Sequence, residues 1–368
     1  MTIRISPRLA AMPHYEPGLT TAEVLARFGL SSAVKLASNE SPFPPMPEVA
    51  EAVAAGVAGL NRYPDGPARA LRRELAERHG VDVDQVTVGN GSCELLLLAG
   101  QALLDPGTSV MYATPSFSLY RHLAAAAGAE AVEIPLAGDD GHDLDHMAAM
   151  VDERTRLVIV CNPNNPTGVY RSADAIEAFL GQLPDDLPVL IDEAYNEFVA
   201  APDRGRVLSL ARHRPNLLVT RTFSKAHGLC GLRVGYALGS RAWVAALDTV
   251  RQPFNTNALA QAAALESFRR QGELDRRVRA TIAARVELVA ELDAEGWDVV
   301  PSEANFVLTT PPERLGPGPA VHAELLRRGV IVREGTSLGC SGRLRISIGT
   351  PEEHAVFRAA RADLAATV

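Results

Sequence analysis

Seven short apolar segments alternate with helical patterns between about residue 67 and residue 250. They are rich in β-branched residues and lack the strict apolar–polar alternation of a half-exposed strand, so they are typical of a sheet that is buried on both faces. The pattern predicts a doubly wound α/β domain, in which ligands bind at the carboxyl ends of the strands. The predicted strands cover residues 85–90, 109–115, 131–136, 156–163, 188–195, 216–223 and 234–239.

The segments on either side of this region have different patterns. Residues 1–45 are rich in Pro and Ser, which predicts an extended arm that leads into a helix over 47–58. After Pro253 a long helical pattern over 257–295 precedes strands at 304–310, 330–334 and 343–349 and helices at 321–329 and from Pro351. These elements predict a smaller α+β domain, which the arm joins. We therefore expect an N-terminal arm at 1–45, a large domain at 46–255 and a small C-terminal domain at 256–368.

Composition and charge narrow the class of protein. The chain has 368 residues, of which 47% are hydrophobic and 22% charged, as in ordinary globular proteins of two domains. A net charge of −8 argues against a nucleic-acid partner but says little about a small anionic ligand. The four scattered cysteines lack metal-binding spacing, so we expect free thiols and no metal. No segment has the length of a membrane span or the core of a signal peptide, so we expect a cytoplasmic protein without a membrane partner.

Polar residues of complementary kinds follow four of the predicted strands. The first is VTVGNGSCELLLLAG at 86–100, which reads as a strand, a glycine turn and a helix start. Free N–H groups at a helix N-terminus bind anions such as phosphate, although a simple structural turn fits this stretch equally well. It does not match a dinucleotide fingerprint, because Glu94 stands where the third glycine belongs. The second is CNPNNPTG at 161–168, either a turn that favours Asn and Pro or a rigid loop that points Asn165 out of the carboxyl edge.

The third strand end, in VLIDEAYNEF, places a carboxylate directly after an apolar strand. Asp192 follows four apolar residues, and burial of its charge is costly unless a cationic or hydrogen-bonding partner meets it. The partner is either a core arginine or a protonated nitrogen of a ligand. Tyr195 adds a phenolic donor near the same edge.

The fourth strand end is TFSKAHGLCGLRVGYALG at 222–239, where Lys225 lies among glycines and small apolar residues. A lysine held in a desolvated pocket has a lowered pKa and a nucleophilic amine, whereas a snorkelling lysine at a strand end is the ordinary structural alternative. Thr222 and Ser224 add hydroxyl groups, and Arg233 can bind phosphate bidentately. Together the four strand ends supply the groups that pyridoxal 5'-phosphate requires: a phosphate cradle, a carboxylate for its ring nitrogen, donors for its phenolate and an imine-forming lysine.

The motifs NxNPTG, DEAY and SKxxGLxGLRxGY, in that order, resemble those of fold-type I pyridoxal-phosphate-dependent aminotransferases of class I and II, over essentially the whole chain. KLASNESPFPP, NRYPD, PSFSLY, PSEANFV and GRLRISIGTPEE further resemble the histidinol-phosphate aminotransferase subfamily and its close relatives, the bacterial aromatic (phenylalanine) aminotransferases. The resemblance implies a large domain with a mostly parallel seven-stranded sheet and a smaller α+β C-terminal domain.

The resemblance also assigns roles toward the cofactor. It implies that Lys225 forms a Schiff base with pyridoxal phosphate and shuttles a proton, and that Asp192 keeps the ring nitrogen protonated. Asn165 and Tyr195 are expected to hold the phenolate oxygen, and Phe117 to stack on the ring. The phosphate group is expected to bind at Ser92, Cys93, Ser224 and Arg233, beside Thr222, and at Tyr63 of a second subunit.

Two consequences of the resemblance concern the subunits and the substrate. A tyrosine that reaches a neighbouring subunit implies a homodimer with shared active sites. The substrate-side candidates are Arg345, which resembles the arginine that grips the acidic group, together with Tyr15, Asn39 and Arg333; a surface ion pair or a turn are the structural alternatives for these residues. Cys93 stands where relatives usually have the aspartate of GNGSDE, and backbone N–H groups can still hold the phosphate there.

The implied activity is ping-pong transamination between L-histidinol phosphate or an aromatic amino acid and 2-oxoglutarate or glutamate. A decarboxylase of the threonine-phosphate type uses the same scaffold and cofactor, and release of CO2 distinguishes it from a transaminase. A degenerate regulatory protein is the alternative from another class. Such regulators normally add a DNA-binding helix-turn-helix domain, for which the chain has no room, and the presence of Lys225, Asp192 and Arg233 disfavours this alternative.

Overall fold

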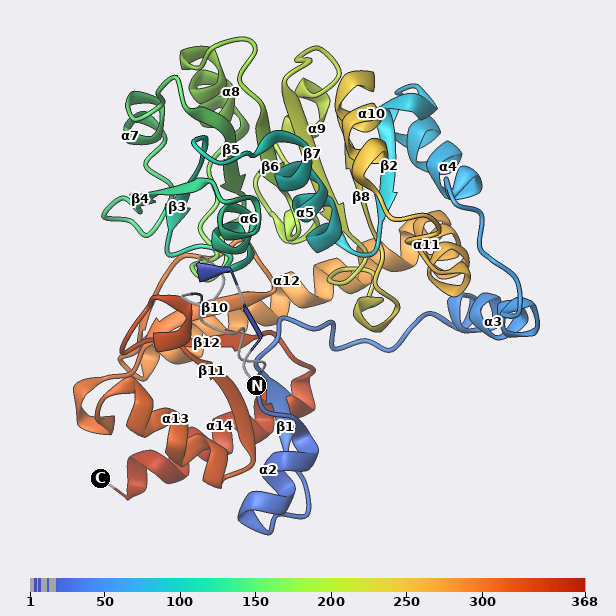
Figure 1. Ribbon diagram of the computed structural model, residues 1–368. Helices are drawn as coiled ribbons and strands as arrows, with labels where there is room; N and C mark the ends of the chain where they lie inside the picture. Colours follow the sequence, from blue (N-terminus) through green and yellow to red (C-terminus); the bar gives the residue numbers. More distant parts are fainter. Residues whose placement is uncertain (1–2, 5, 8–11, 13–17, 368) are drawn as a thin grey trace.

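The computed structural model describes residues 3, 4, 6, 7, 12 and 18–367 and contains two sheets (Figure 1). The larger sheet has seven strands in the order β2-β8-β7-β6-β5-β3-β4. Only β8 runs antiparallel to its neighbours, so the prediction of a mostly parallel seven-stranded sheet is confirmed. The strands, each within a predicted segment or one residue beyond it, are β2 (Val86–Gly89), β3 (Ser109–Thr114), β4 (Glu130–Pro135), β5 (Thr155–Cys161), β6 (Val189–Asp192), β7 (Leu217–Thr222) and β8 (Gly235–Leu238).

Helices cover both faces of the large sheet, which explains why its strands are apolar without alternation. In β5, Leu157 and Ile159 pack into the core on one face, while Val158 and Val160 pack into the core on the other. The first face is covered by α5 (Ser92–Leu103), α6 (Leu119–Ala127) and α10 (Arg241–Val250). The second is covered by α3 (Pro47–Gly56), α4 (Arg69–His79), α7 (Leu144–Ala149), α8 (Ala173–Gln182), α9 (Arg206–Leu210) and α11 (Ala258–Arg269).

The smaller sheet has the order β1-β11-β12-β10-β9. Its first strand, β1, comes from the N-terminal segment and pairs in parallel with β11, whereas its other pairs are antiparallel. The elements are β1 (Val34–Leu36), β9 (Asp298–Val299), β10 (Phe306–Thr310), β11 (Val330–Glu334) and β12 (Leu344–Ser347), with helices α13 (Gly318–Arg327) and α14 (Pro351–Ala366). Short 3-10 helices lie at Val57–Gly59, Val83–Gln85, Asn196–Phe198, Cys230–Leu232, Glu313–Leu315 and Thr336–Leu338.

Two expectations about helices were wrong. The N-terminal arm is not extended throughout, because α2 occupies Thr21–Phe28. Thr20 and Glu23 form a capping box at its start, and Gly29 ends it at a φ of 64°. The long helical pattern over 257–295 is divided into α11 and α12 (Gln271–Ala294), because the backbone of Arg270 leaves the helical region between them.

The division of the chain near residue 256 stays a prediction. Helix α11, which follows this point, packs against α3 and α4 on the large sheet. Helix α12 contacts β9 and β10 of the small sheet as well as the turn at Asn196–Phe198, and Figure 1 shows it running between the two layers. Among the helices of the described residues, none combines the length and the apolar character that a membrane span requires.

Candidate active site

The carboxyl ends of three central strands meet at one edge of the large sheet. Cys161 at the end of β5 is the register partner of Asp192 at the end of β6, and Asp192 in turn is the partner of Thr220 in β7. Side chains that follow these strands in the sequence therefore lie close together, although the strands are separated by whole helices along the chain. This edge is the ligand-binding position expected of a doubly wound sheet.

Asp192 is 2% exposed and is held by hydroxyl groups instead of a cation. Tyr120 donates a hydrogen bond to its Oδ2 at 3.0 Å, and Thr220 donates one to its Oδ1 at 3.2 Å. Burial raises the pKa of Asp192 to about 6, against the lowering effect of these two bonds. A core arginine was the other partner considered for Asp192. Arg221, on the neighbouring strand β7, instead forms an ion pair with Glu193 at 2.7 Å. A buried carboxylate that lacks a cation in the described part of the chain suits a protonated ligand nitrogen.

The amine of Lys225 points into the site and not toward solvent. Its Nζ donates to the carbonyl oxygens of Ser38 at 3.3 Å and Asn39 at 3.1 Å, and it lies 5.7 Å from the centre of the Tyr195 ring. Burial, followed by the positive charge of Arg345, lowers the pKa of Lys225 to about 8. More of the amine is therefore neutral and nucleophilic near neutral pH than in an ordinary lysine, and the alternative of a snorkelling lysine does not describe this geometry.

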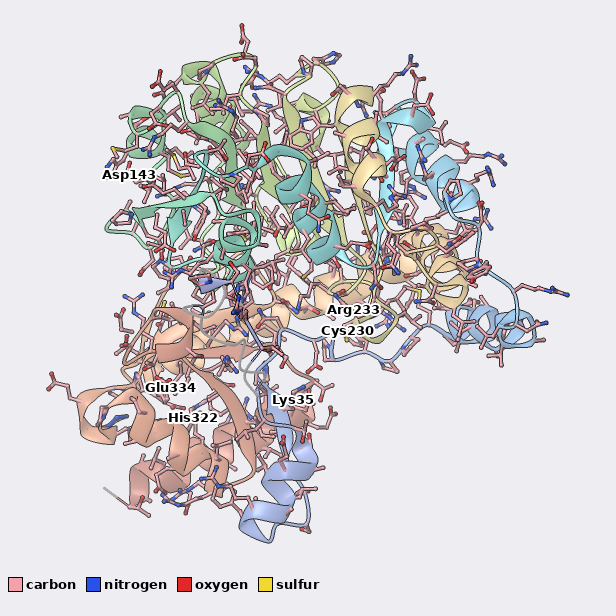
Figure 2. The ribbon with its side chains drawn as sticks, viewed as in Figure 1. Lys35, Asp143, Cys230, Arg233, His322 and Glu334 are labelled. Atoms are coloured by element: carbon pink, nitrogen blue, oxygen red, sulfur yellow. The ribbon has the colours of Figure 1, made fainter. Side chains whose placement is uncertain are left out.

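A cradle for an anion lies beside this lysine. Helix α5 begins at Ser92, directly after Gly91, which has a φ of 83°. A Cβ atom on Gly91 would stand 2.6 Å from Nη2 of Arg233, so the missing side chain lets the guanidinium approach the N-terminus of the helix closely. Arg233 itself adopts a φ of 58° and donates to Ser224 Oγ at 3.3 Å and to the carbonyl of Cys230 at 3.0 Å. Figure 2 shows Arg233 and Cys230 together at the lower edge of the large sheet.

Cys93 lies inside the same site. Burial raises the pKa of its thiol first, and the negative charge of Asp192 raises it further, while the charges of Arg233 and Lys225 lower it. The side chain is thus close enough to all three groups to sense their charges. A neutral thiol here adds no negative charge of its own to the N-terminus of α5, which favours anion binding by the N–H groups of the helix.

A second group of polar contacts closes the site from the small sheet. Asn39, with a φ of 53°, donates from Nδ2 to Tyr195 Oη at 3.1 Å. Arg345 donates from Nη1 to Asn165 Oδ1 at 2.6 Å and from Nη2 to the carbonyl of Ala37 at 2.9 Å. Residues from the N-terminal segment, both sheets and the loop after β5 therefore meet at one point.

Two arginines lie directly opposite each other on neighbouring strands of the small sheet. Arg333 in β11 is the register partner of Arg345 in β12, and Arg345 is 7% exposed. Like charges at such positions repel each other, so an anion beside them is favourable. The positive charge of Arg345 contributes to the lowered pKa of Lys225.

The remaining predicted site residues occupy different places. Phe117 packs edge to face on Tyr120, with ring centroids 5.7 Å apart, and Thr222 Oγ1 accepts a hydrogen bond from the backbone N–H of Ser224 at 3.1 Å. Tyr63 is 82% exposed and stacks on Phe254, with ring centroids 4.5 Å apart, on the surface of this chain. Tyr15 lies outside the described residues.

Sequence reasoning missed Tyr120 and Thr220, the two hydroxyl partners of Asp192. Tyr120 is the last residue of the PSFSLY motif, from which only Phe117 was selected. Its position in the first turn of α6 gives no sign that it faces a strand 72 residues away. Thr220 could have been found from the in-register pairing of β6 with β7, because a polar residue inside an apolar strand needs a partner.

The arrangement fits pyridoxal phosphate. The helix N-terminus at Gly91, with Arg233 beside it, suits a phosphate group; Asp192 suits a protonated ring nitrogen, and the amine of Lys225 suits a carbonyl carbon. Tyr195 and Asn165 lie on the Lys225 and Arg345 side of the site, where they can meet the ring substituent and the substrate. These groups come from separate segments of the chain and meet only at the carboxyl edge of the large sheet.

Comparison with known proteins gives a consistent result. Residues 31–360 match the family described as aminotransferase class I and II. The chain is 44% identical over 363 residues, 98% of its length and 97% of the relative's, to histidinol-phosphate aminotransferase 2 of Ralstonia nicotianae. It is 41% identical to histidinol-phosphate aminotransferase of Geobacillus thermodenitrificans, with 96% of this chain and 95% of the relative covered.

Solved structures agree with this result. The pyridoxal-5'-phosphate complex of histidinol-phosphate aminotransferase from Sinorhizobium meliloti superposes with a TM-score of 0.90 at 25% identity, covering 100% of this chain and 99% of that one. Aspartate aminotransferase from Thermus thermophilus with maleate superposes with a TM-score of 0.85 at 27% identity, covering 100% of both chains. With a family match over residues 31–360 and relatives that are 44% and 41% identical over nearly the full length, this chain belongs to the family of class I and II aminotransferases.

Proposed function

We propose that the chain is a pyridoxal-phosphate-dependent transaminase that transfers an amino group between L-histidinol phosphate and 2-oxoglutarate by a ping-pong mechanism. The observation that carries the proposal is that three groups meet at one sheet edge: a lysine with a lowered pKa, a buried carboxylate that meets no cation among the described residues, and a helix N-terminus beside Arg233. The relatives at 41–44% identity that carry the name histidinol-phosphate aminotransferase support the choice of amino donor.

The cofactor supplies an electron sink for the carbon from which a proton is removed. The protein's part is to hold it and to control charge. Arg233 and the N-terminus of α5 bind the phosphate group, and Cys93 adds no charge that would compete with it. Asp192 pairs with the ring nitrogen, and the hydroxyl groups of Tyr120 and Thr220 keep the carboxylate in place.

Lys225 has two tasks. Its amine would hold the cofactor at the carbonyl carbon, and it would take and return the proton of the substrate carbon. Both tasks need a neutral amine at the operating pH, which the lowered pKa of about 8 makes available. The carbonyl oxygens of Ser38 and Asn39 direct the amine toward Tyr195.

Arg345 and Arg333 are the proposed acid-binding residues. L-Histidinol phosphate presents a phosphate dianion, which can engage two guanidinium groups, whereas phenylalanine offers a single carboxylate to this pair. The same pair suits 2-oxoglutarate, which also carries two negative charges. Asn165, held by Arg345 at 2.6 Å, lies between this acid-binding pair and the large sheet.

We further propose a homodimer in which Tyr63 completes the phosphate site of the partner. Tyr63 is 82% exposed, and Phe254, on which it stacks, is 46% exposed. Val57 and Leu60, which precede Tyr63 in the chain, are 51% and 54% exposed. Exposed apolar and aromatic side chains of this density are typical of an interface. Tyr63→Phe, which removes only the hydroxyl, should leave the dimer intact in sedimentation but weaken pyridoxal-phosphate binding; unchanged cofactor affinity would contradict the shared site.

A panel of single half-reactions tests the proposed substrate. The enzyme loaded with pyridoxal phosphate is mixed separately with L-histidinol phosphate, phenylalanine, tyrosine, tryptophan and glutamate, and loss of the absorbance of the lysine-bound cofactor is followed. L-Histidinol phosphate should react with the highest kcat/KM among the first four, and 2-oxoglutarate should restore the starting spectrum. A faster reaction with phenylalanine would assign the enzyme to aromatic amino acids, and CO2 release would assign it to decarboxylation.

Lys225→Ala is the control for the chemical assignment. It should still bind pyridoxal phosphate through the cradle and Asp192, and it should fail every half-reaction in the panel. Turnover by this variant would contradict the role of Lys225, whatever the substrate.

A further inference from the structure

A second concave site lies on the face of the large sheet that α4 and α9 cover. It is an open cleft of about 430 Å³, within the usual range for small-molecule sites. None of Lys225, Asp192, Arg233 and Arg345 lines it, so it is distinct from the active site. We call it the arginine cleft, and its lining residues are Arg78, His79, Pro202, Asp203, Arg204, Gly205, Arg206, Leu208, Ser209, Arg212 and Arg221.

The charges of the arginine cleft are strongly one-sided. Five of its lining residues are arginines, and Asp203 is its single lining carboxylate. Asp203 already accepts a hydrogen bond from the backbone N–H of Ala173 at 2.6 Å. Two of the arginines have carboxylate partners: Arg221 pairs with Glu193 at 2.7 Å and Arg206 with Glu177 at 2.5 Å as well as with Asp174.

The other three, Arg78, Arg204 and Arg212, form no ion pair with any residue that the structure describes. They are nevertheless positioned by neutral contacts. Arg204 donates from Nη1 to the carbonyl of Glu197 at 3.0 Å, Arg212 donates to the carbonyl of His79, and the guanidinium of Arg78 lies 5.3 Å from the centre of the Phe268 ring. Three oriented guanidinium groups from α4 and the loops around α9 thus surround one open space, and none of the three forms an ion pair with a described residue.

The neighbouring titratable groups are consistent with a positive field in the cleft. Burial, and then the charges of Arg221, Arg212 and Arg78, lower the pKa of His79 to about 3, so this ring is neutral. Glu197 lies in the adjoining smaller cavity and is outside the lining of the arginine cleft; burial raises the pKa of its carboxyl group, whereas the charge of Arg221 lowers it. Arg78, Arg204 and Arg212 are therefore the arginines of the cleft whose guanidinium groups have no ion-pair partner among the described residues.

We infer that the arginine cleft binds a small anion that carries more than one phosphate group. Guanidinium groups bind phosphate oxygens bidentately, and three of them match an anion with several charges better than a monoanion. The volume of the cleft exceeds that of a single phosphate group, which favours a larger phosphate-bearing anion such as a diphosphate. The inference does not depend on the proposed substrate, because the cleft shares no lining residue with the active site.

Isothermal titration of the cofactor-loaded enzyme with inorganic pyrophosphate at low ionic strength tests the inference. Arg204→Gln combined with Arg212→Gln removes two of the unpaired charges, and about a tenfold or larger loss of affinity is expected, since hydrogen bonds to charged groups are the stronger ones. Arg241→Gln is the matched control, because Arg241 is an exposed arginine paired with Asp82 outside the cleft. This control should bind pyrophosphate as the unaltered enzyme does.

Three further results complete the test. Arg345→Gln should retain pyrophosphate binding, and loss of binding in this variant would place the anion in the active site and overturn the inference. Absence of saturable binding at millimolar pyrophosphate, or equal affinity for citrate, would also overturn it. Thermal melting guards against misfolded variants: the double variant should keep one cooperative transition, and pyrophosphate should raise its melting temperature less than it raises that of the unaltered enzyme.

Discussion

The hydroxyl group of Tyr120 should control the pH at which the enzyme binds its cofactor, and Tyr120→Phe removes that hydroxyl alone. Tyr120 is fully buried and donates to Asp192 Oδ2 at 3.0 Å, while Thr220 keeps its own bond to Oδ1. The carboxylate of Asp192 must be ionised to pair with the ring nitrogen. Loss of one bond to this charged form therefore makes ionisation harder.

The size of the effect follows from the strength of that bond. A hydrogen bond to a charged group contributes about 1.5–3 kcal/mol, and one pKa unit corresponds to about 1.4 kcal/mol. The pKa of Asp192, raised by burial to about 6, should thus rise by roughly 1–2 units in Tyr120→Phe. At neutral pH, Asp192 then changes from mostly ionised to half or more protonated.

The assay is an equilibrium titration of cofactor-free enzyme with pyridoxal phosphate over a range of pH values. The acid limb of the affinity profile should move up by roughly 1–2 pH units in Tyr120→Phe, and the affinities should converge at about pH 9, where Asp192 is ionised in both proteins. Tyr112→Phe is the matched control, because the Tyr112 hydroxyl donates to Glu133 at 2.7 Å in the same core region. An acid limb that stays in place, or an affinity reduced equally at every pH, would refute the reasoning.

Three other changes give separate tests. Gly235→Ala should lower the free energy of unfolding by about 1–3 kcal/mol and weaken cofactor binding, because the new Cβ atom would lie 2.5 Å from the backbone N of Ser92 at the start of α5. If this packing were loose, calorimetry and cofactor titration would show neither effect. Arg345→Gln should lower kcat/KM by about 10- to 100-fold through lost charged hydrogen bonds, and an unchanged value would remove Arg345 from the substrate site. Burial lowers the pKa of His227 to about 3, whereas the same histidine in the unfolded chain binds a proton below about pH 6.5. The folded form therefore loses stability as pH falls below about 6.5. His227→Gln, which can still bond to Ser267, should reduce the loss between about pH 6.5 and pH 5 by roughly 2 kcal/mol in denaturant titrations, and an equal loss in both proteins would refute this assignment.

Much of the fold was accessible from the sequence because the relevant signals are local. Apolar runs without alternation mark strands that are covered on both faces, and all seven predicted strands are present in the large sheet. The error in the N-terminal arm has a local cause as well. The short helix α2 lies among Pro- and Ser-rich segments, and its capping box, Thr20 with Glu23, was the available signal.

The candidate chemistry was accessible for a related reason. Lys225, Asp192 and Arg233 stand out because a charged residue among apolar or small residues is costly unless a partner meets it. Their role toward one cofactor followed from the combination of residue types. The partners were not accessible in the same way, because Tyr120 reads as an ordinary residue of an amphipathic helix.

The sequence by itself determined where the strands and helices lie and which residue types stand at the strand ends. Only the tertiary structure decided which of these side chains meet. Asn39 contacts Tyr195 across 156 residues, and Arg345 contacts Asn165 across 180. The arginine cleft likewise gathers Arg78 and Arg212 from segments far apart in the chain. The physical reason is that local propensity and hydrophobic periodicity act over a few residues, whereas such contacts depend on strand register and on the packing of two sheets.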